Sequence, residues 1–228
     1  MKLLFLSDLH FNQRWYDWIR TQEVAAVFLA GDLLDLFRSG WPGGQKLTFA
    51  DWVDKLPLAL ALCSGNHDHV SAESNWLQKI KRPGLVTDGE TAILETAGGN
   101  LVVTTIPWEA LNQRALWVEG ARLREQFGLR WIVLHHEPPF ETKIGGNAGT
   151  AYLNLFIAQF QPDLVASGHL HEQPYSGDFL DRLGSTWVFN PGHAEAPLPN
   201  CILVEDFQKA TWFHWPNYKT AITSRSLL

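Results

Sequence analysis

Short apolar runs separated by polar breaks recur along the chain, and most have the length of a β-strand. Several of the early runs carry almost no polar residue, which is typical of strands buried on both faces of a sheet. The runs that predict strands are Lys2–Leu6, Ala25–Ala30, Leu58–Cys63, Ala92–Glu95, Leu101–Ile106, Arg130–Leu134, Leu164–Ala166, Thr186–Phe189, Cys201–Glu205 and Ala210–His214.

Stretches with helical spacing lie between the early runs. They predict helices at Arg14–Gln22, Thr48–Lys55, Glu73–Ile80, Ala110–Phe127 and Thr150–Gln159. Strands that alternate with helices favour parallel pairing, whereas the consecutive strands near the C-terminus favour antiparallel pairing. The pattern therefore predicts a layered α/β sandwich. A Gly-rich break at Phe37–Lys46 predicts an insertion near a site rather than a linker between domains.

Length and composition narrow the class of protein. The chain has 228 residues, of which 46% are hydrophobic, and this favours one domain over residues 1–228 with a sizeable core. The net charge of −6 gives no general attraction to a phosphate backbone, so extended nucleic-acid binding is disfavoured. We expect neither disorder nor a coiled coil from this composition.

The cysteines and the first residues bear on the compartment. Cys63 and Cys201 both lie in apolar runs, so a disulfide framework is not expected. The polar residues Ser7 and Asp8 interrupt the apolar start before an export signal could be completed. No run approaches the roughly 20 apolar residues of a membrane-spanning helix. These features predict a cytoplasmic protein without a transmembrane segment, and they leave its oligomeric state open.

Tryptophan is abundant, with 11 residues. Trp41, in the Gly/Pro-rich stretch Ser39–Gly44, and Trp108, after Pro107, are candidates to line a substrate cleft. The others lie in apolar periodic segments and are expected in the core or under docked helices; they are Trp15, Trp18, Trp52, Trp76, Trp117, Trp131, Trp187, Trp212 and Trp215.

Polar residues with metal-binding side chains follow several of the predicted strands. In open α/β sheets the carboxyl ends of the strands are where ligand sites assemble, so these residues are expected to meet at one edge. The segments are Asp8-Leu9-His10, Gly31-Asp32-Leu33-Leu34-Asp35, Gly65-Asn66-His67-Asp68, His135-His136-Glu137-Pro138-Pro139 and Gly168-His169-Leu170-His171.

Their spacing favours a centre with two metal ions. Residues two positions apart just past a strand can point the same way, which applies to Asp8 with His10 and to His169 with His171. Two nearby divalent cations need a carboxylate that bridges them, and Asp32 is the candidate. Imidazole, carboxylate and amide oxygen without thiolate suit manganese, iron, zinc or cobalt, and among these we expect manganese.

The five segments, in this order, resemble the calcineurin-like metallophosphoesterase family. The resemblance runs from Leu3 to His171 and continues weakly into Asn190-Pro191-Gly192. It implies an αββα sandwich of two mixed β-sheets flanked by helices, with the metal site at the carboxyl ends of the strands. It further implies one metal ion held by Asp8, His10, Asp32 and His171, and a second held by Asp32, Asn66, His136 and His169.

The resemblance also implies a mechanism. A hydroxide that bridges the two metal ions would attack phosphorus, and His67 would donate a proton to the leaving group while Asp35 orients its ring. His136 rather than His135 fits the ligand position, since it stands two residues before Pro138. Three histidines have no position in the pattern: His69 and His193 are candidates to touch substrate, and His214 is expected on the surface or in the core.

The function that follows is hydrolysis of a small phosphoester or nucleotide, with phosphodiesters favoured over monoesters. A nuclease of the DNA-repair exonuclease type is an alternative, which the net charge of −6 disfavours. A second alternative is a non-catalytic scaffold, as found among relatives that have lost metal ligands. The retained His67 argues against a scaffold, because a scaffold needs no proton donor.

Overall fold

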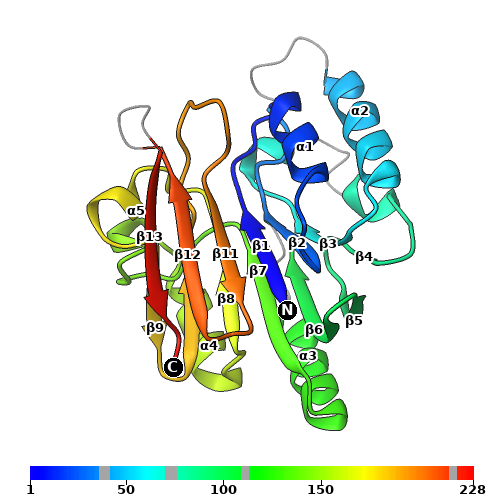
Figure 1. Ribbon diagram of the computed structural model, residues 1–228. Helices are drawn as coiled ribbons and strands as arrows, with labels where there is room; N and C mark the ends of the chain where they lie inside the picture. The colour runs from blue at the N-terminus through cyan, green and yellow to red at the C-terminus, as the bar shows by residue number, and fades with distance from the viewer. Residues whose placement is uncertain (36–41, 70–75, 109–112, 216–219) are drawn as a thin grey trace.

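The computed structural model describes residues 1–35, 42–69, 76–108, 113–215 and 220–228. Within these residues the chain forms two mixed β-sheets that stack face to face, with helices on both outer faces (Figure 1). The predicted αββα sandwich is confirmed. The extent of a single domain over residues 1–228 stays a prediction.

The larger sheet combines parallel and antiparallel strands in the order β13-β12-β11-β1-β2-β3-β4. Strands β1 to β4 run parallel, and β11 joins β1 in antiparallel fashion, with Leu3 opposite Val204. The strands are β1 (Lys2–Leu6), β2 (Ala26–Ala30), β3 (Ala59–Cys63), β4 (Leu85–Val86), β11 (Cys201–Glu205), β12 (Lys209–His214) and β13 (Ala221–Ser226).

The smaller sheet has the order β5-β6-β7-β8-β10-β9, and its four central strands are parallel. Antiparallel strands close both of its edges. Its strands are β5 (Thr91–Thr96), β6 (Gly99–Ile106), β7 (Arg130–His135), β8 (Leu164–Ala166), β9 (Leu180–Leu183) and β10 (Thr186–Phe189).

Helices cover the outer faces of both sheets. Helices α1 (Gln13–Arg20) and α2 (Pro42–Lys55) pack on the larger sheet, and α3 (Arg114–Phe127) and α4 (Ala151–Phe160) pack on the smaller one. A short helix, α5 (Gln173–Ser176), follows β8. No helix among the described residues is long and apolar enough to cross a membrane.

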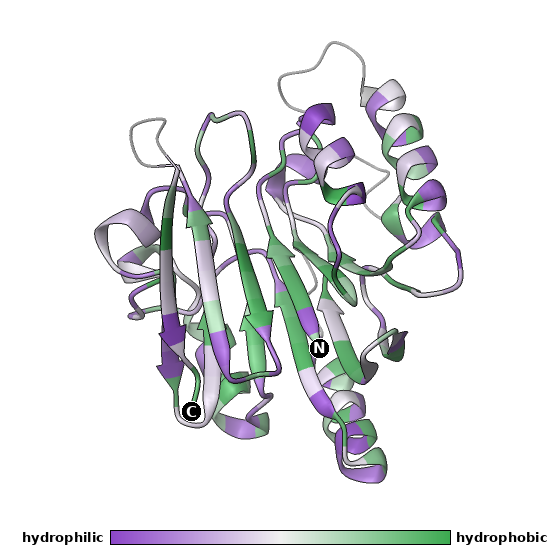
Figure 2. Ribbon diagram, in the orientation of Figure 1, coloured by the Kyte–Doolittle hydropathy of each residue, from purple (hydrophilic) through white to green (hydrophobic). Residues whose placement is uncertain are grey.

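Apolar side chains fill the space between the two sheets, and the strands there are the most hydrophobic part of the ribbon (Figure 2). Phe5 and Phe28 of the larger sheet stack with ring centroids 4.7 Å apart, and Phe189 of the smaller sheet meets Phe5 edge-on at 5.9 Å. Burial of such rings is the main source of stability in this layer. The core therefore fixes how the two sheets lie against each other.

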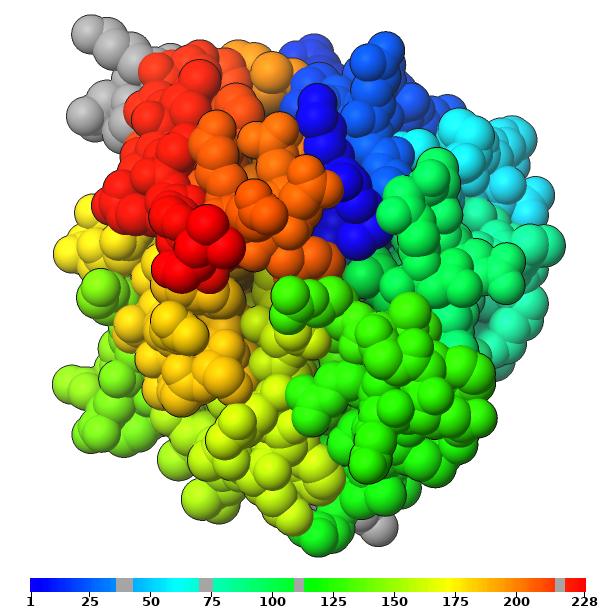
Figure 3. All heavy atoms as spheres, turned by 60° about the horizontal axis from the view of Figure 1, so that its bottom comes forward, coloured from blue at the N-terminus to red at the C-terminus, as the bar shows by residue number. Residues whose placement is uncertain are grey.

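The parallel strands of both sheets point to the same end of the sandwich, the upper end in Figure 1. At the opposite end, the start of β1 lies between the β11–β12 turn and the segment around β5 (Figure 3). There Met1 is held by its backbone carbonyl, which accepts from the Asp206 N–H at 2.9 Å, and by contact with Thr96. Because the parallel strands point to the upper end, the loops that follow them come together at that edge and not at the end where Met1 lies.

Several predicted boundaries were wrong. Helix α2 begins at Pro42, inside the stretch predicted as a loop, because Pro is well tolerated in the first turn of a helix. The helix predicted at Glu73–Ile80 is, in its described part, only a 3₁₀ turn at Leu77–Lys79. The strands β4, β9 and β13 were not predicted.

The tryptophans follow the prediction in part. Six of those expected in the core are buried, whereas Trp18, Trp187 and Trp215 are only partly buried. Trp41 lies outside the described residues. Trp108 is half-buried at the edge where the parallel strands end.

Candidate metal centre

The first two parallel strands end in a strained backbone. Asp8, His10 and Asp32 have positive φ angles of 55°, 44° and 50°, a region that residues other than Gly seldom adopt. Two backbone hydrogen bonds hold the two loops together: Asp8 N–H donates to the Gly31 carbonyl at 3.0 Å, and His10 N–H to the Asp32 carbonyl at 3.0 Å. Strain of this kind costs about 1–3 kcal/mol per residue and is concentrated at functional sites.

Glycines before the polar residues allow these loops to approach each other closely. A Cβ at Gly31 would lie 2.4 Å from Nδ1 of His136, and a Cβ at Gly168 would lie 2.6 Å from Oδ2 of Asp8. Neither neighbour could move away, because His136 and Asp8 are fully buried. The glycines of the Gly-Asp and Gly-His segments are therefore required for packing of the site.

Four of the predicted ligands form one compact group. Asp8, His10, Asp32 and His171 each offer a nitrogen or carboxylate oxygen, and these atoms all lie within 4.8 Å of one another. Nε2 of His171 is 3.1 Å from Oδ1 of Asp8 and 3.3 Å from Nε2 of His10. This is the set predicted for the first metal ion.

The remaining predicted ligands meet beside it. Oδ1 of Asn66 lies 3.2 Å from Nε2 of His136 and 3.0 Å from Nδ1 of His169. Nε2 of His136 is also 3.2 Å from Oδ2 of Asp32. Asp32 thus contacts both groups, as a bridging carboxylate would.

The two adjacent histidines at the end of β7 point to different surroundings. Nδ1 of His136 donates to the Ala30 carbonyl at 2.7 Å, which turns Nε2 toward Asp32. His135 accepts a hydrogen bond from the Glu137 N–H at 3.1 Å instead. Burial lowers the pKa of His135 to about 3, with a further contribution from His136, so its ring is neutral. The geometry favours His136 as the ligand.

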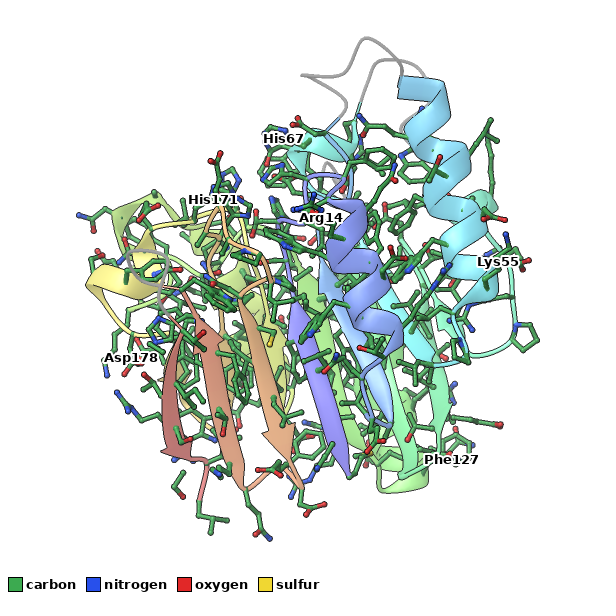
Figure 4. The ribbon with its side chains drawn as sticks, turned by 45° about the horizontal axis from the view of Figure 1, so that its top comes forward. Arg14, Lys55, His67, Phe127, His171 and Asp178 are labelled. Carbon is green, nitrogen blue, oxygen red and sulfur yellow. The ribbon has the colours of Figure 1, made fainter. Side chains whose placement is uncertain are left out.

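His67 and Asp35 form a hydrogen-bonded pair next to the first group. Nδ1 of His67 lies 3.0 Å from Oδ1 of Asp35, and the His67 backbone N–H donates to Oδ1 of Asp32 at 2.8 Å. The His67 ring also meets that of His10 edge-on, with centroids 4.7 Å apart. Figure 4 shows His67 and His171 at the same edge of the molecule, although they belong to segments that follow different sheets.

Asp68 has a supporting role that was not predicted from the sequence. Its buried carboxylate accepts hydrogen bonds from the backbone N–H groups of Leu33, Leu34 and Gly65 at 2.7–3.1 Å. These bonds tie the loop after β2 to the loop after β3. Burial and the nearby charge of Asp32 raise the pKa of Asp68 to about 8. A motif-based signal existed, since Asp68 ends the Gly-Asn-His-Asp segment.

Asn190 supports the histidine loop after β8. Its Nδ2 donates to the carbonyls of Gly168 and Leu170 at 3.1 and 3.2 Å, and its Oδ1 accepts from the Gly192 N–H at 2.8 Å. The Asn-Pro-Gly turn follows β10, which pairs with β8. It therefore holds the loop after β8 that carries His169 and His171. The sequence indicated this turn only through the family resemblance.

In the buried part of the site, neighbouring carboxylates and imidazoles shift one another's pKa values. Burial would raise the pKa of Asp8, but its contacts with His171 and His136 outweigh that effect and lower it. The pKa of Asp32 is also lowered, because His136 outweighs burial. Conversely, burial disfavours a charge on His136, yet Asp32 and Asp8 raise its pKa to about 9. Burial lowers the pKa of His10 to about 4.

Two buried polar atoms show that the site suits a cation. Oδ2 of Asp8 and Nδ1 of His10 have no hydrogen-bond partner among the described residues. A buried carboxylate oxygen without a donor is costly, and a divalent cation would satisfy it. Carboxylate, amide oxygen and imidazole are also the donors that such cations accept. The residues therefore fit a dinuclear metal centre.

A cleft lies beside the first group of predicted ligands, and a tryptophan lies beside the second group. The cleft has a volume of about 760 Å³ and opens beside His10, Asp35 and His171. Beside the second group, the ring of Trp108 lies 5.1 Å from that of His169 and 5.5 Å from that of His136. Trp108 does not line this cleft, so its predicted role at a substrate cleft is not met here; its ring lies beside the second group of predicted ligands instead.

The remaining histidines differ in their distance from the centre. His193 lines the cleft, and its ring contacts those of His10 and His171 at 5.2 and 4.7 Å. His69 lies 3.1 Å from the Ser64 hydroxyl. His214, at the end of β12, is buried and stacks on Trp212 with ring centroids 3.6 Å apart, as expected for a core residue.

Comparison with known proteins agrees with this arrangement. A family model described as calcineurin-like phosphoesterase matches residues 1–173, which include every predicted metal ligand as well as His67 and Asp35. The chain belongs to this family. It is accordingly a hydrolase of phosphoester bonds, and its family depends on dinuclear metal centres.

Solved structures share the fold at low sequence identity. TT1561 of Thermus thermophilus aligns with a TM-score of 0.64 at 14% identity, covering 100% of this chain and 99% of that chain. A dimetal phosphatase from Danio rerio aligns with a TM-score of 0.58 at 9% identity, covering 100% and 99%. The NAD nucleotidase of Haemophilus influenzae gives 0.57 at 15% identity, covering 99% and 49%. A comparison with curated protein sequences finds no match.

Proposed function

We propose that the protein is a two-metal phosphodiesterase that acts on small phosphodiesters or nucleotides. The observation that carries this proposal is the contact of Asp32 with both groups of predicted ligands, next to the His67–Asp35 pair. Such a combination joins two cation sites to a proton donor. A scaffold would need neither.

One metal ion would be held by Asp8, His10, Asp32 and His171, and the second by Asp32, Asn66, His136 and His169. Cations bound there would lower the pKa of water and neutralise charge on the phosphoryl oxygens. We propose manganese from among the cations that imidazoles, carboxylates and an amide oxygen accept, with iron, zinc and cobalt as alternatives.

His67 has the surroundings of a general acid. Asp35 fixes Nδ1 of the ring at 3.0 Å, and the proton donor to the leaving-group oxygen would be Nε2. Proton donation matters most for an alkoxide, since an alcohol with a high pKa leaves poorly without it. His67 would therefore donate its proton at the bridging oxygen of an alkyl ester.

Preference for diesters is supported by the two flanks of the centre. A phosphodiester carries two substituents, whereas a phosphomonoester carries one. The 760 Å³ cleft can receive one substituent, and the ring of Trp108 offers a wall for the other. The net charge of −6 speaks against long nucleic acids as substrates. The free, buried Cys63 and Cys201 are in keeping with a cytoplasmic location.

The direct test uses chelator-stripped protein supplied with Mn²⁺. Bis(4-nitrophenyl) phosphate and 4-nitrophenyl phosphate carry the same chromophore, so their kcat/KM values can be compared directly. We expect metal-dependent hydrolysis with the diester turned over at least about tenfold faster. Faster monoester turnover would contradict the diesterase assignment, and the absence of any metal-dependent turnover would contradict the enzymatic function proposed.

A further inference from the structure

The cleft beside the metal centre has walls that the proposed reaction does not use. Besides His10, Asp35 and His171, it is lined by His193, Trp15 and the segment Ala194–Pro197. The indole N–H of Trp15 donates to the Ala196 carbonyl at 3.2 Å and ties this segment to α1. These contacts give the cleft a defined wall within the described residues.

His193 is the polar residue of this wall that lies nearest the centre. Its Nδ1 is 2.8 Å from the backbone carbonyl of Asp8. Because a carbonyl only accepts, Nδ1 carries the proton in the neutral ring, and Nε2 is left as an acceptor. No hydrogen bond from a described residue to Nε2 is present, and His193 lines the cleft, so Nε2 is the acceptor of this ring that is available to a ligand.

The backbone holds this ring in place. The His193 N–H donates to the His171 carbonyl at 3.2 Å, and the preceding Gly192 adopts a φ of 66°. The ring also packs against Trp15, with centroids 5.4 Å apart. The ring of His193 is thus held at a fixed position next to the predicted ligands His10 and His171.

The rim of the cleft is richer in acceptors than in cations. Glu172 and Glu195 are exposed there, and among the described lining residues Arg14, on the first turn of α1 (Figure 4), is the one Lys or Arg side chain. Neither glutamate has an ion-pair partner among the described residues. Together with Nε2 of His193, they favour a ligand that brings hydrogen-bond donors rather than negative charge.

The position of the His67–Asp35 pair indicates which part of a substrate enters the cleft. The departing alcohol must have its oxygen at His67, and Asp35, the partner of His67, lines the cleft. The rest of that alcohol would extend from this oxygen along the cleft, past His10 and His193. The opposite substituent would lie on the Trp108 side.

We propose that the cleft is the leaving-group subsite and that it selects alcohols bearing further hydroxyl or ammonium groups, with His193 accepting a hydrogen bond from one of them. This assignment rests on the proposed phosphodiesterase activity. It makes His193 a specificity-determining residue for that reaction.

The test compares two symmetric diesters in the Mn²⁺-loaded protein. Bis(2,3-dihydroxypropyl) phosphate and dipropyl phosphate have the same carbon skeleton, so either end can leave and only the hydroxyl groups differ. We expect kcat/KM to be at least about tenfold higher for the hydroxylated diester, because a hydrogen-bonding site discriminates against an analogue that lacks the donor.

Two sets of variants locate the origin of that preference. His193→Asn keeps an N–H group that can reach the Asp8 carbonyl but removes the acceptor at Nε2, and it should reduce the preference about fivefold. The double variant Glu172→Gln with Glu195→Gln should weaken the preference for the analogous bis(2-aminoethyl) phosphate over dipropyl phosphate. Glu125→Gln, on the exposed face of α3, is the matched control and should change neither ratio.

The outcomes separate this assignment from the proposed function. If bis(4-nitrophenyl) phosphate is hydrolysed but the wild type does not favour the hydroxylated diester, the subsite is wrong and the phosphodiesterase stands. Retention of the full preference by His193→Asn would likewise overturn the role of His193. A higher kcat/KM for a diester whose alkyl chain ends in phosphate would show a cationic subsite around Arg14 and would overturn the assignment.

Discussion

The two flanks of the metal centre differ in how far they are open to solvent. On the cleft side, His171 has a side chain that is 35% exposed, and His67 and Asp35 are 20% and 15% exposed. On the Trp108 side, the side chain of His136 is 0% exposed and hydrogen-bonds to the Ala30 carbonyl. We call the cleft side the open flank and the surroundings of His136, which is held from behind, the closed flank; Trp108 and His169 at the outer edge of the closed flank are partly exposed.

This difference has a structural origin. The closed flank is supported from the buried ends of β2, β3 and β7, and Ser64 links it to Asp88 and Trp108 through bonds of 2.7 and 3.1 Å. The open flank is formed by loops and by the Asn-Pro-Gly-His turn. Rigid support on one flank and access on the other are both needed for a hydrolase that must admit and release its substrate.

The largest expected effect comes from the residue that both flanks share. Asp32→Asn should lower kcat/KM by at least about 10⁴-fold and prevent stable binding of either metal ion, because the bridging charge is lost. Asn keeps an acceptor for the His67 N–H, so the fold should be preserved. Activity and metal content measured on the same preparation check this. Normal activity with normal metal content would refute the shared role of Asp32.

On the closed flank, His136→Ala should lower kcat/KM by about 10³-fold and reduce bound metal, because it removes a buried side chain that we propose as a ligand. His135→Ala is the matched control from the neighbouring position and should keep its metal. Metal analysis of both variants distinguishes them. Loss of metal in His135→Ala alone would show that the ligand assignment is reversed.

On the open flank, His67→Ala should retain metal and slow turnover of diesters with poor leaving groups by about 10²-fold. Esters with good leaving groups should be affected much less, since they need little proton donation. The comparison of 4-nitrophenyl and alkyl diesters measures this. Equal losses on both classes would contradict proton donation by His67.

Trp108→Ala should have a smaller effect on activity, about fivefold in KM with little change in kcat, because the ring is proposed as a wall rather than as a reacting group. Trp18→Ala is the control variant, because it removes a partly buried ring away from the centre. Trp212→Ala is unsuitable as a control, because the loss of this buried ring would destabilise the core. A similar KM for Trp108→Ala and the wild type would show that this flank does not contact substrate.

Asp88 supports the closed flank from within, and its substitution is expected to change stability rather than activity. Burial raises the pKa of Asp88 to about 6, above its ordinary value of 3.8. Between these pH values the folded chain keeps a proton that the unfolded chain releases, so stability from this group falls as pH rises from 4 to 6.

Asp88→Asn removes this titration. Its free energy of unfolding relative to the wild type should therefore increase by up to about 3 kcal/mol between pH 4 and pH 6 and stay level above that. Denaturant titrations of chelator-stripped protein at several pH values measure the difference. A constant difference across this range would show that Asp88 ionises with an ordinary pKa.

The strands of the site could be predicted because apolar runs of strand length recur with polar residues directly after them. Parallel pairing then places Asp8, Asp32 and Asn66 at one edge without further information. The start of α2 could not be predicted, since Gly43 and Gly44 normally disfavour a helix. The exposed edge strand β13 alternates too weakly to be recognised.

Supporting residues were harder to identify than the predicted ligands. Asp68 acts through backbone N–H groups of a loop more than 30 residues away, and no local pattern encodes such a bond. His193 reaches the cleft only because β10 pairs with β8, which brings the Asn-Pro-Gly turn beside the histidine loop. Contacts of this kind depend on the tertiary fold and not on residue spacing.

The central claim is that the chain holds two metal ions in one centre. The most direct test is the stoichiometry of Mn²⁺ bound to chelator-stripped protein, measured by calorimetric titration and by elemental analysis of the reloaded protein. The account predicts two ions per chain in the wild type. One ion per chain, or none, would contradict it.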